Sequence, residues 1–351
     1  MKIYKFITQI SIAGCMLVGT PMLQGCMDNS LNDPLGKVSE EELGRDGFAA
    51  NAFFLTLCDY AYPIATENIY NTNESLIGDC YGRYQVMATD KFKGANFATY
   101  NAPENWLNWQ FADDNVMVLT YGAWNKIKNV TQGTGVNFAW AQILRIATMH
   151  RMLDMYGALP YSQISSDKFS APYDTMEEAY HAMFTDLTDA INVMTVYVTE
   201  NPNNRTMAKY DKVYDGDFEK WVKFANSLKL RMAIRIRFAD REYARQMAEE
   251  AINHSIGVIT SNEDNATSLG TKNQLYTVLV QWPDQCVSAD ITSYMKGYND
   301  PRMSKYFKKK TSDKGDDDYV GMRAGLSYGN DITGPTFSRI NVGEMDRTLW
   351  M

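Results

Sequence analysis

One stretch decides the fold: it runs from Asp217 to Phe238 and reads DFEKWVKFANSLKLRMAIRIRF. At helical spacing, one face of this stretch is continuously apolar. That face consists of Phe218, Trp221, Val222, Ala225, Leu228, Met232 and Ile236. Phe224, Leu230 and Ile234 add apolar groups on the other sides. A helix that is apolar nearly all round is normally enclosed by other helices, so we predict a central packing helix here.

Helical periodicity also marks the sequence before and after this stretch. We predict helices over residues 48–62, 106–130, 138–156, 175–196, 217–238 and 241–254. Gly157 and Pro160 form a C-terminal stop, and Asp174 with Glu177 resembles a capping box for the next helix. Short links between such helices favour antiparallel pairs. The sequence therefore predicts a mostly α fold of tetratricopeptide-like helical pairs.

Other parts of the chain read as irregular. Residues 62–103 are rich in Asn, Thr, Gly and Tyr, with Pro63 and Pro103 at the ends. We predict a long irregular loop there, and loops of this length are usually functional or mobile. Beyond residue 255 the periodicity fades. Asp300-Pro301-Arg302 reads as a turn with an arginine able to pair with a carboxylate.

Composition and charge exclude some classes of protein. The 351 residues are 45% hydrophobic and 22% charged, which is ordinary for a globular chain. A net charge of -8 argues against nucleic-acid binding, because an acidic surface repels phosphates. Outside the first thirty residues the cysteines are Cys58, Cys80 and Cys286. A single Cys58–Cys80 bridge is one option, and three buried thiols is the favoured one.

The first 38 residues read as an export and anchoring segment. A basic start is followed by an apolar run, Phe6–Val18, that is too short to span a bilayer. Leu23-Gln24-Gly25-Cys26 resembles a bacterial lipobox, in which the cysteine thiol is acylated. We predict a signal peptide over 1–25, lipidation at Cys26 and a flexible tether over 26–38. Asp28 is similar to the acidic surface-export signals of Bacteroidetes lipoproteins.

Four motifs in order resemble those of one family. Trp221 to Arg235 is similar to the "kWikfANSLklRlAmRi" helix of the SusD/RagB nutrient-binding lipoproteins. The other three motifs are AQILRIATMHRMLDMYGALPYSQ at 141–163, ITSNEDNA at 259–266 and DITSYMKGYNDPR at 290–302. The resemblance extends over residues 26–351. It implies one helical domain over 39–351, a C-terminally incomplete chain, and an outer-membrane location facing outward.

The family resemblance also implies a function. It implies a protein that binds oligosaccharides, less often peptides, and delivers them to a SusC-like TonB-dependent transporter without cleaving them. No cofactor is expected. Two alternatives remain open from the residues alone: a helical glycan-degrading enzyme, which needs two carboxylates about 5–10 Å apart, and a purely structural helical-repeat lipoprotein.

The residues themselves offer few catalytic motifs. His150, His181 and His254 lie far apart in the sequence, so we predict packed or surface histidines and no metal site. The acidic run at 313–318 lacks the ligand spacing of a calcium loop. Aromatic rings can lie flat against sugars while polar groups take the hydroxyls. The candidate ligand-binding residues are therefore Tyr70, Tyr81, Tyr84, Tyr100, Trp106 and Trp109, with Asn71, Asn73, Asp79, Arg83 and Asn101 as polar neighbours.

Overall fold

The structure of the protein, a computed structural model, describes most of the chain after residue 47. The described residues are 48–62, 67–89, 97–111, 116–164, 170–269, 274–282, 284–311, 317–326, 336–341 and 347–349. The chain divides into two units, Met1–Ala49 and Ala50–Met351. The predicted signal peptide, the lipidation site Cys26 and the tether lie outside the described residues.

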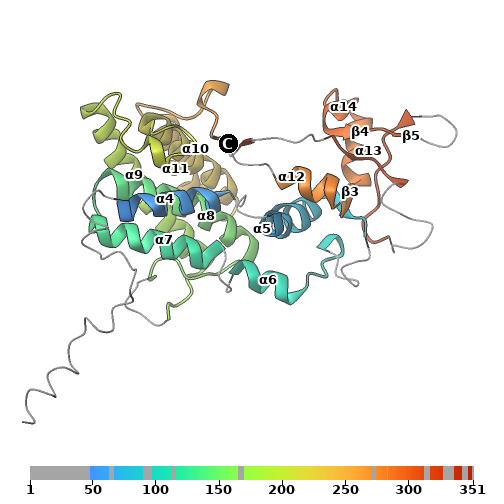
Figure 1. The fold of residues 1–351 in the computed structure, drawn as a ribbon, viewed down its shortest axis with the longest axis horizontal. Coiled ribbons are helices and arrows are strands. Elements are labelled where there is room, and N and C mark those ends of the chain that lie inside the picture. Colours follow the sequence, from blue (N-terminus) through green and yellow to red (C-terminus); the bar gives the residue numbers. More distant parts are fainter. Residues whose placement is uncertain are drawn as a thin grey trace, which may run out of the picture. The chain divides into compact units, whose positions relative to one another are not determined.

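Successive helices in the middle of the chain pack side by side. They are α7 (Val116–Thr131), α8 (Gly135–Tyr156), α9 (Met176–Glu200), α10 (Phe218–Ile236) and α11 (Arg241–Ile252). α7 packs on α8, α8 on α9, and α10 on both α9 and α11 (Figure 1). The predicted mostly helical fold is therefore confirmed. Among the described residues, none of the helices combines the length and the hydropathy that a membrane span needs.

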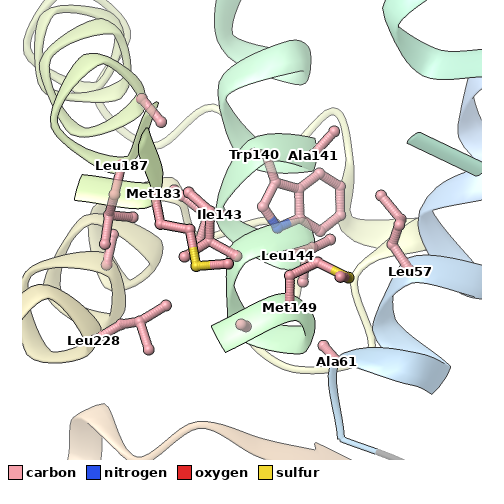
Figure 2. Packing of buried hydrophobic residues seen from close by; sticks show 14 of the residues in the cluster. Leu57, Ala61, Trp140, Ala141, Ile143, Leu144, Met149, Met183, Leu187 and Leu228 are labelled. Atoms are coloured by element: carbon pink, nitrogen blue, oxygen red, sulfur yellow. The ribbon is translucent and has the colours of Figure 1, made fainter. Parts of the chain in front are cut away.

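Two tryptophans lie at the centre of the helical core. Trp140 of α8 and Trp221 of α10 are fully buried, with ring centroids 5.7 Å apart. Phe54 of α4 (Phe48–Ala61) stacks on Trp140 at 4.3 Å and an interplanar angle of 11°. Figure 2 shows Leu57 of α4 on one side of α8 and Met183 of α9 on the other. α8 is thus packed between neighbours on both sides, which explains why its sequence is apolar over a broad face.

The stretch that decides the fold forms α10, and its predicted apolar face is buried. The Trp221 indole N–H donates to Asp211 at 2.7 Å, and the same carboxylate accepts the backbone amides of residues 213, 214 and 216. The prediction that other helices enclose α10 nearly all round is wrong at its C-terminal end. Ile234 is 51% exposed there, although α11 packs on α10.

Arg145 is a charged side chain that lies inside this helical core. Arg145 of α8 is 3% exposed, and its guanidinium carbon lies 4.1 Å from the Trp124 ring centroid and 4.2 Å from that of Tyr161. Its Nη2 donates to Asp186 Oδ2 at 2.5 Å. The Tyr161 hydroxyl donates to the same carboxylate oxygen at 2.8 Å. Arg145 therefore joins α7, α8 and α9 through one cation held between two rings.

The ends of the helices follow the rules of capping, with one shift. α8 ends at Gly157, whose φ of 78° favours glycine, as predicted. α9 has its capping box at Thr175 and Glu178, so the predicted pair of Asp174 and Glu177 is wrong by one residue. Asp174 instead accepts hydrogen bonds from the amides of residues 161 and 162 and from the Ser162 hydroxyl. The Asp174 carboxylate therefore binds the turn at residues 161 and 162, and Thr175 is the N-cap of α9.

Two predicted segments differ in the structure. The helix predicted over 106–130 is two helices, α6 (Glu104–Phe111) and α7. The prediction of an irregular loop over 62–103 is wrong for much of its length. The described part of that segment contains α5 (Glu67–Tyr70), the π-helix η3 (Asn71–Asp79), β1 (Gln85–Met87) and the short 3-10 helix η4 (Phe97–Thr99). A π-helix spaces its hydrogen bonds by five residues, so a search for the α-helical period does not detect it.

The later part of the chain consists of short elements. They are η6 (Asn262–Asp264), β2 (Thr267–Leu269), α12 (Gln274–Tyr276), the π-helix η7 (Thr277–Gln281), β3 (Gln285–Val287), α13 (Ala289–Gly297), α14 (Met303–Tyr306), β4 (Phe307–Lys308), β5 (Lys310–Thr311), β6 (Asp317–Asp318), β7 (Arg339–Ile340) and β8 (Arg347–Leu349). The strands form antiparallel pairs: β1 with β3, β2 with β8, β4 with β7 and β5 with β6. Arg302 pairs with Asp300 in the predicted turn, at 2.5 Å.

The cysteines that the structure describes are all buried and free. Cys58 lies in the helical core, whereas Cys80 and Cys286 lie in a separate cluster around β1 and β3. The favoured prediction of three buried thiols is confirmed, and the alternative Cys58–Cys80 bridge is wrong. Burial raises the pKa of Cys80 and of Cys286 to about 12, so both stay protonated at neutral pH.

Candidate functional site

A tight turn after η3 carries two exposed tyrosines. The helical segment runs to Tyr81, and Gly82 donates its amide to the Gly78 carbonyl at 2.9 Å. A Cβ on Gly82 would lie 3.0 Å from that carbonyl oxygen and from the Tyr84 ring, so a larger residue there would force these groups to shift. The turn leaves Tyr81 42% exposed and Tyr84 54% exposed.

A third tyrosine from another segment joins this turn. Tyr100 follows η4, is 71% exposed, and its ring centroid lies 5.4 Å from that of Tyr81 at an interplanar angle of 36°. The Arg83 guanidinium carbon lies 6.0 Å from the Tyr100 ring centroid. We call Tyr81, Arg83, Tyr84 and Tyr100 the tyrosine surface. Its exposed rings and single cation offer stacking faces and hydrogen-bond donors to a ligand.

The backbone of the tyrosine surface is strained at two positions. Arg83 has a φ of 60° and Tyr100 a φ of 59°, both in the left-handed region that non-glycine residues rarely adopt. Such a conformation costs about 1 kcal/mol or more per residue and persists where the surroundings enforce it. Strained residues of this kind occur at ligand clamps, but they also occur in ordinary turns of this chain, at Gln132, Asn203, Asp215 and Asn299.

A partly buried carboxylate, that of Asp79, precedes the turn and is hydrogen-bonded to its far end. Asp79 Oδ2 accepts a hydrogen bond from the Gln85 amide nitrogen at 2.5 Å, and the Asp79 carbonyl accepts the Tyr84 amide at 2.8 Å. Burial raises the pKa of Asp79 to about 6, and the hydrogen bond from Gln85 opposes this rise. The carboxylate thus changes charge near pH 6, two residues before Tyr81 in the chain.

The turn is held in place by pairing between distant parts of the chain. Gln85 of β1 pairs with Val287 of β3, and the amide of Ser288 donates to the Tyr84 carbonyl at 3.1 Å. The Gln285 amide nitrogen donates to the Ser75 carbonyl at 2.6 Å. The turn that carries Tyr81 and Tyr84 is therefore held against β3 by backbone hydrogen bonds, and a side-chain hydrogen bond joins β3 to η3.

The structure distributes the predicted ligand-binding residues unevenly. It brings Tyr81 and Tyr100 into ring contact and leaves Tyr84 exposed in the same turn. Trp106 of α6 is half-buried against the cluster around β1 and β3. Tyr70 is only 6% exposed, in a different cluster with Val278 and Leu279, so it has little surface for stacking. Trp109 lies in α6, but its side chain is outside the described residues.

The polar residues predicted to accompany these rings also divide into buried and more exposed ones. Asn71 and Asn73 are 5% and 6% exposed in η3, so they face the interior. Arg83 belongs to the tyrosine surface, Asp79 is partly buried just before the turn, and Asn101 is exposed directly after Tyr100. The polar groups that remain exposed or half-buried beside these rings are therefore the guanidinium of Arg83 and the amide of Asn101.

The cavities described here lie elsewhere, along α9, α10 and α11. One, of about 510 Å³, is a groove between α10 and α11 that includes Ile234 and Phe238. Another, of about 400 Å³, is lined by residues of α9, by the end of α10 and by Asp240. In this second cavity Asp154 accepts hydrogen bonds from the Tyr180 hydroxyl at 2.7 Å and from Arg235 at 3.2 Å. Neither cavity was predicted from the sequence.

Comparison with known proteins gives a family for this fold. The profile of the SusD-like family, described as SusD and RagB outer membrane lipoprotein, matches residues 30–351. The chain belongs to the SusD-like family. The predicted membership of the SusD/RagB lipoproteins is therefore confirmed. None of the curated proteins compared with the chain matches it.

Solved structures agree with the family. A SusD homologue from Bacteroides uniformis is 35% identical and superposes with a TM-score of 0.77, covering 87% of this chain and 63% of its own. A chitin-binding SusD homologue from Flavobacterium johnsoniae is 31% identical with a TM-score of 0.74, covering 86% and 62%. This chain therefore spans about three fifths of the length of these SusD homologues.

Proposed function

We propose that this SusD-like protein binds an oligosaccharide at its tyrosine surface and delivers it, uncleaved, to a TonB-dependent transporter. The observation that carries the proposal is the pair of exposed rings, Tyr81 and Tyr100, whose centroids lie 5.4 Å apart. The family gives the class of protein, and the Flavobacterium homologue is described as chitin-binding. An oligosaccharide is the ligand that both arguments favour.

The chemistry of the surface suits a sugar. Sugars present apolar C–H faces, which pack against aromatic rings, and hydroxyls, which need donors and acceptors. The tilt of 36° between Tyr81 and Tyr100 gives two differently oriented stacking faces. Arg83 beside the rings can donate to ring or hydroxyl oxygens. The proposed contact is therefore stacking for affinity, with Arg83 setting the orientation of the sugar.

A matched set of variants tests glycan binding. We expect Tyr100→Ala and Tyr81→Ala each to weaken binding of chito-oligosaccharides by about 5- to 30-fold, as the loss of about 1–2 kcal/mol of aromatic packing implies. Tyr298→Ala is the control, because Tyr298 is 81% exposed at the end of α13. Isothermal titration calorimetry measures the affinities, and chromatography of the same samples shows whether the glycan is cleaved.

Three results would overturn the proposal. The first is an absence of binding across a broad glycan array, which would remove the ligand class. The second is an equal loss of affinity in Tyr298→Ala, which would remove the tyrosine surface as the site. The third is the appearance of shortened glycans, which would favour the alternative of a glycan-degrading enzyme.

The anchor and the partner are part of the same proposal. We propose that acylation of Cys26 holds the protein on the outer membrane, facing outward. A ligand held between lipoprotein and transporter escapes less readily than one bound to either alone. We expect Cys26→Ala to release the protein from the membrane fraction, and a native pull-down of the wild type to recover a transporter barrel. Membrane retention of Cys26→Ala, or a pull-down without a barrel, contradicts this part.

A further inference from the structure

Three side chains able to bind a metal meet where α9 and α11 begin. Glu177 and His181 lie one turn apart on α9, and Asp240 is the N-cap of α11. One donor atom from each residue lies within 4.8 Å of the other two, and His181 Nε2 is 3.1 Å from Asp240 Oδ2. We propose that Glu177, His181 and Asp240 bind a divalent transition-metal ion, with Zn²⁺ as the first candidate.

The donor set suits this class of ion. Imidazole favours zinc and neighbouring transition metals, whereas calcium and magnesium prefer oxygen ligands alone. Two carboxylates balance the charge of a divalent ion. Ligands about 2.1 Å from a tetrahedral zinc lie roughly 3.4 Å from one another. The donors of His181 and Asp240 are close to that separation already. Glu177 is exposed, so its carboxylate can turn toward them.

Neighbouring groups orient two of the three donors. The His181 ring lies against the Tyr243 ring, with centroids 4.1 Å apart. Asp240 Oδ1 accepts the Tyr243 amide at 3.2 Å, which leaves Oδ2 for His181 or for a metal. Partners of this kind fix the direction of metal ligands and raise their affinity. His181 and Asp240 are therefore held in place before any ion binds.

The group is also open to solvent. All three residues line the cavity of about 400 Å³, so water can complete the coordination of an ion. The positive charge of Arg235 in that cavity is balanced by Asp154. The bound ion would connect the first turn of α9 to the first turn of α11, two helices that each pack on α10. Binding should therefore raise the melting temperature of the protein.

The alternative is a simple hydrogen bond between His181 and Asp240, in which Glu177 takes no part. The two explanations differ in the role of Glu177, so a variant at this exposed position separates them without disturbing the core. Glu177→Gln keeps the size of the side chain and removes its charge. Asp240→Asn keeps an N-cap for α11, so its effect on metal binding can be separated from an effect on folding.

The experiment is a titration of Zn²⁺ into the purified chain, made without a polyhistidine tag and stripped of metal by chelation. Calorimetry gives the stoichiometry and affinity, and circular dichroism checks that each variant is folded. We expect one ion per chain and a rise in melting temperature with Zn²⁺. Glu177→Gln, His181→Gln and Asp240→Asn should each weaken binding by at least about tenfold. The matched control is His254→Gln, because His254 hydrogen-bonds Thr195 at a distant position on α9.

The possible outcomes are distinct. Weaker Zn²⁺ binding in the three variants, together with wild-type Zn²⁺ affinity in His254→Gln, supports the site. Absence of saturable Zn²⁺ binding overturns it, as does wild-type affinity in Glu177→Gln. An equal loss in His254→Gln would place the metal elsewhere. Calcium binding as tight as zinc binding and unchanged in His181→Gln would show that the imidazole is not a ligand, which also overturns the proposal.

Discussion

Arg145 gives the sharpest test of how the helical scaffold is held together. The change Arg145→Met keeps the approximate length of the side chain and removes the charged, planar guanidinium group. The wild-type guanidinium lies 4.1 Å and 4.2 Å from the Trp124 and Tyr161 ring centroids and donates to Asp186 at 2.5 Å. Each of these contacts is lost in the variant.

The magnitude follows from these contacts. A desolvated cation–π contact contributes up to about 2 kcal/mol, and a hydrogen bond to a charged group about 1.5–3 kcal/mol. The loss of these stabilising contacts is partly offset, because a buried methionine does not carry the cost of burying a charge. The Asp186 side chain is 32% exposed, so water can replace part of its lost partner. We therefore expect Arg145→Met to lower the free energy of unfolding by about 2–4 kcal/mol.

Urea denaturation followed by circular dichroism measures this change. The matched control is Arg245→Met on α11, where a 66% exposed arginine side chain pairs with Glu242 and Glu249. Exposed ion pairs contribute little, so this control should change the free energy of unfolding by less than about 1 kcal/mol. Arg145→Lys should fall between the two, because lysine keeps the charge but cannot lie flat between two rings. Equal losses in Arg145→Met and Arg245→Met would refute the reasoning.

Three further predictions concern stability. The pKa of Asp79 is raised from 3.8 to about 6, so folding favours the protonated carboxyl group. The contribution of this group to the free energy of unfolding is present below about pH 4 and is lost as the pH rises through 6. Below pH 4, Asp79→Asn should therefore have the same free energy of unfolding as the wild type, and at pH 7.5 urea denaturation should show it to be about 1–3 kcal/mol more stable. A difference in the free energy of unfolding that stays constant across this pH range contradicts the raised pKa of Asp79. Asp211→Ala should lower the free energy of unfolding by about 3–5 kcal/mol, because it removes the acceptor of the Trp221 indole and of three backbone amides, and near-wild-type denaturation would disprove this. Thr175→Ala should lower the free energy of unfolding by about 1 kcal/mol, measured by thermal denaturation. An unchanged melting temperature would show that the capping box does not contribute to stability.

The helical pairs could be predicted from sequence because their apolar period and caps are local signals. α8, α9, α10 and α11 each begin or end within a few residues of the predicted bounds. The division between α6 and α7 was missed, although the sequence ADDN at 112–115 contains residues that favour helix starts. The π-helix η3 was missed because its hydrogen bonds follow a different period.

The candidate sites depended on contacts that composition does not show. Tyr70 and Tyr81 lie in the same aromatic segment, yet one is buried and the other exposed, because only packing decides which side each ring takes. The metal-binding group joins His181 to Asp240, which is 59 residues away. A search for paired histidines could not find it. The spacing of Glu177 and His181, four residues apart on one helix, was the local signal available.

The pairing of β1 with β3 has a consequence for how the chain folds. Residues 85 and 287 are partners in this ladder, so its formation closes a loop of about 200 residues. Pairings between such distant segments form slowly compared with neighbouring helices. During synthesis, β1 therefore emerges long before its partner, with Val86 and unsatisfied backbone groups open to association. A chaperone that shields this short segment would be most useful in that interval.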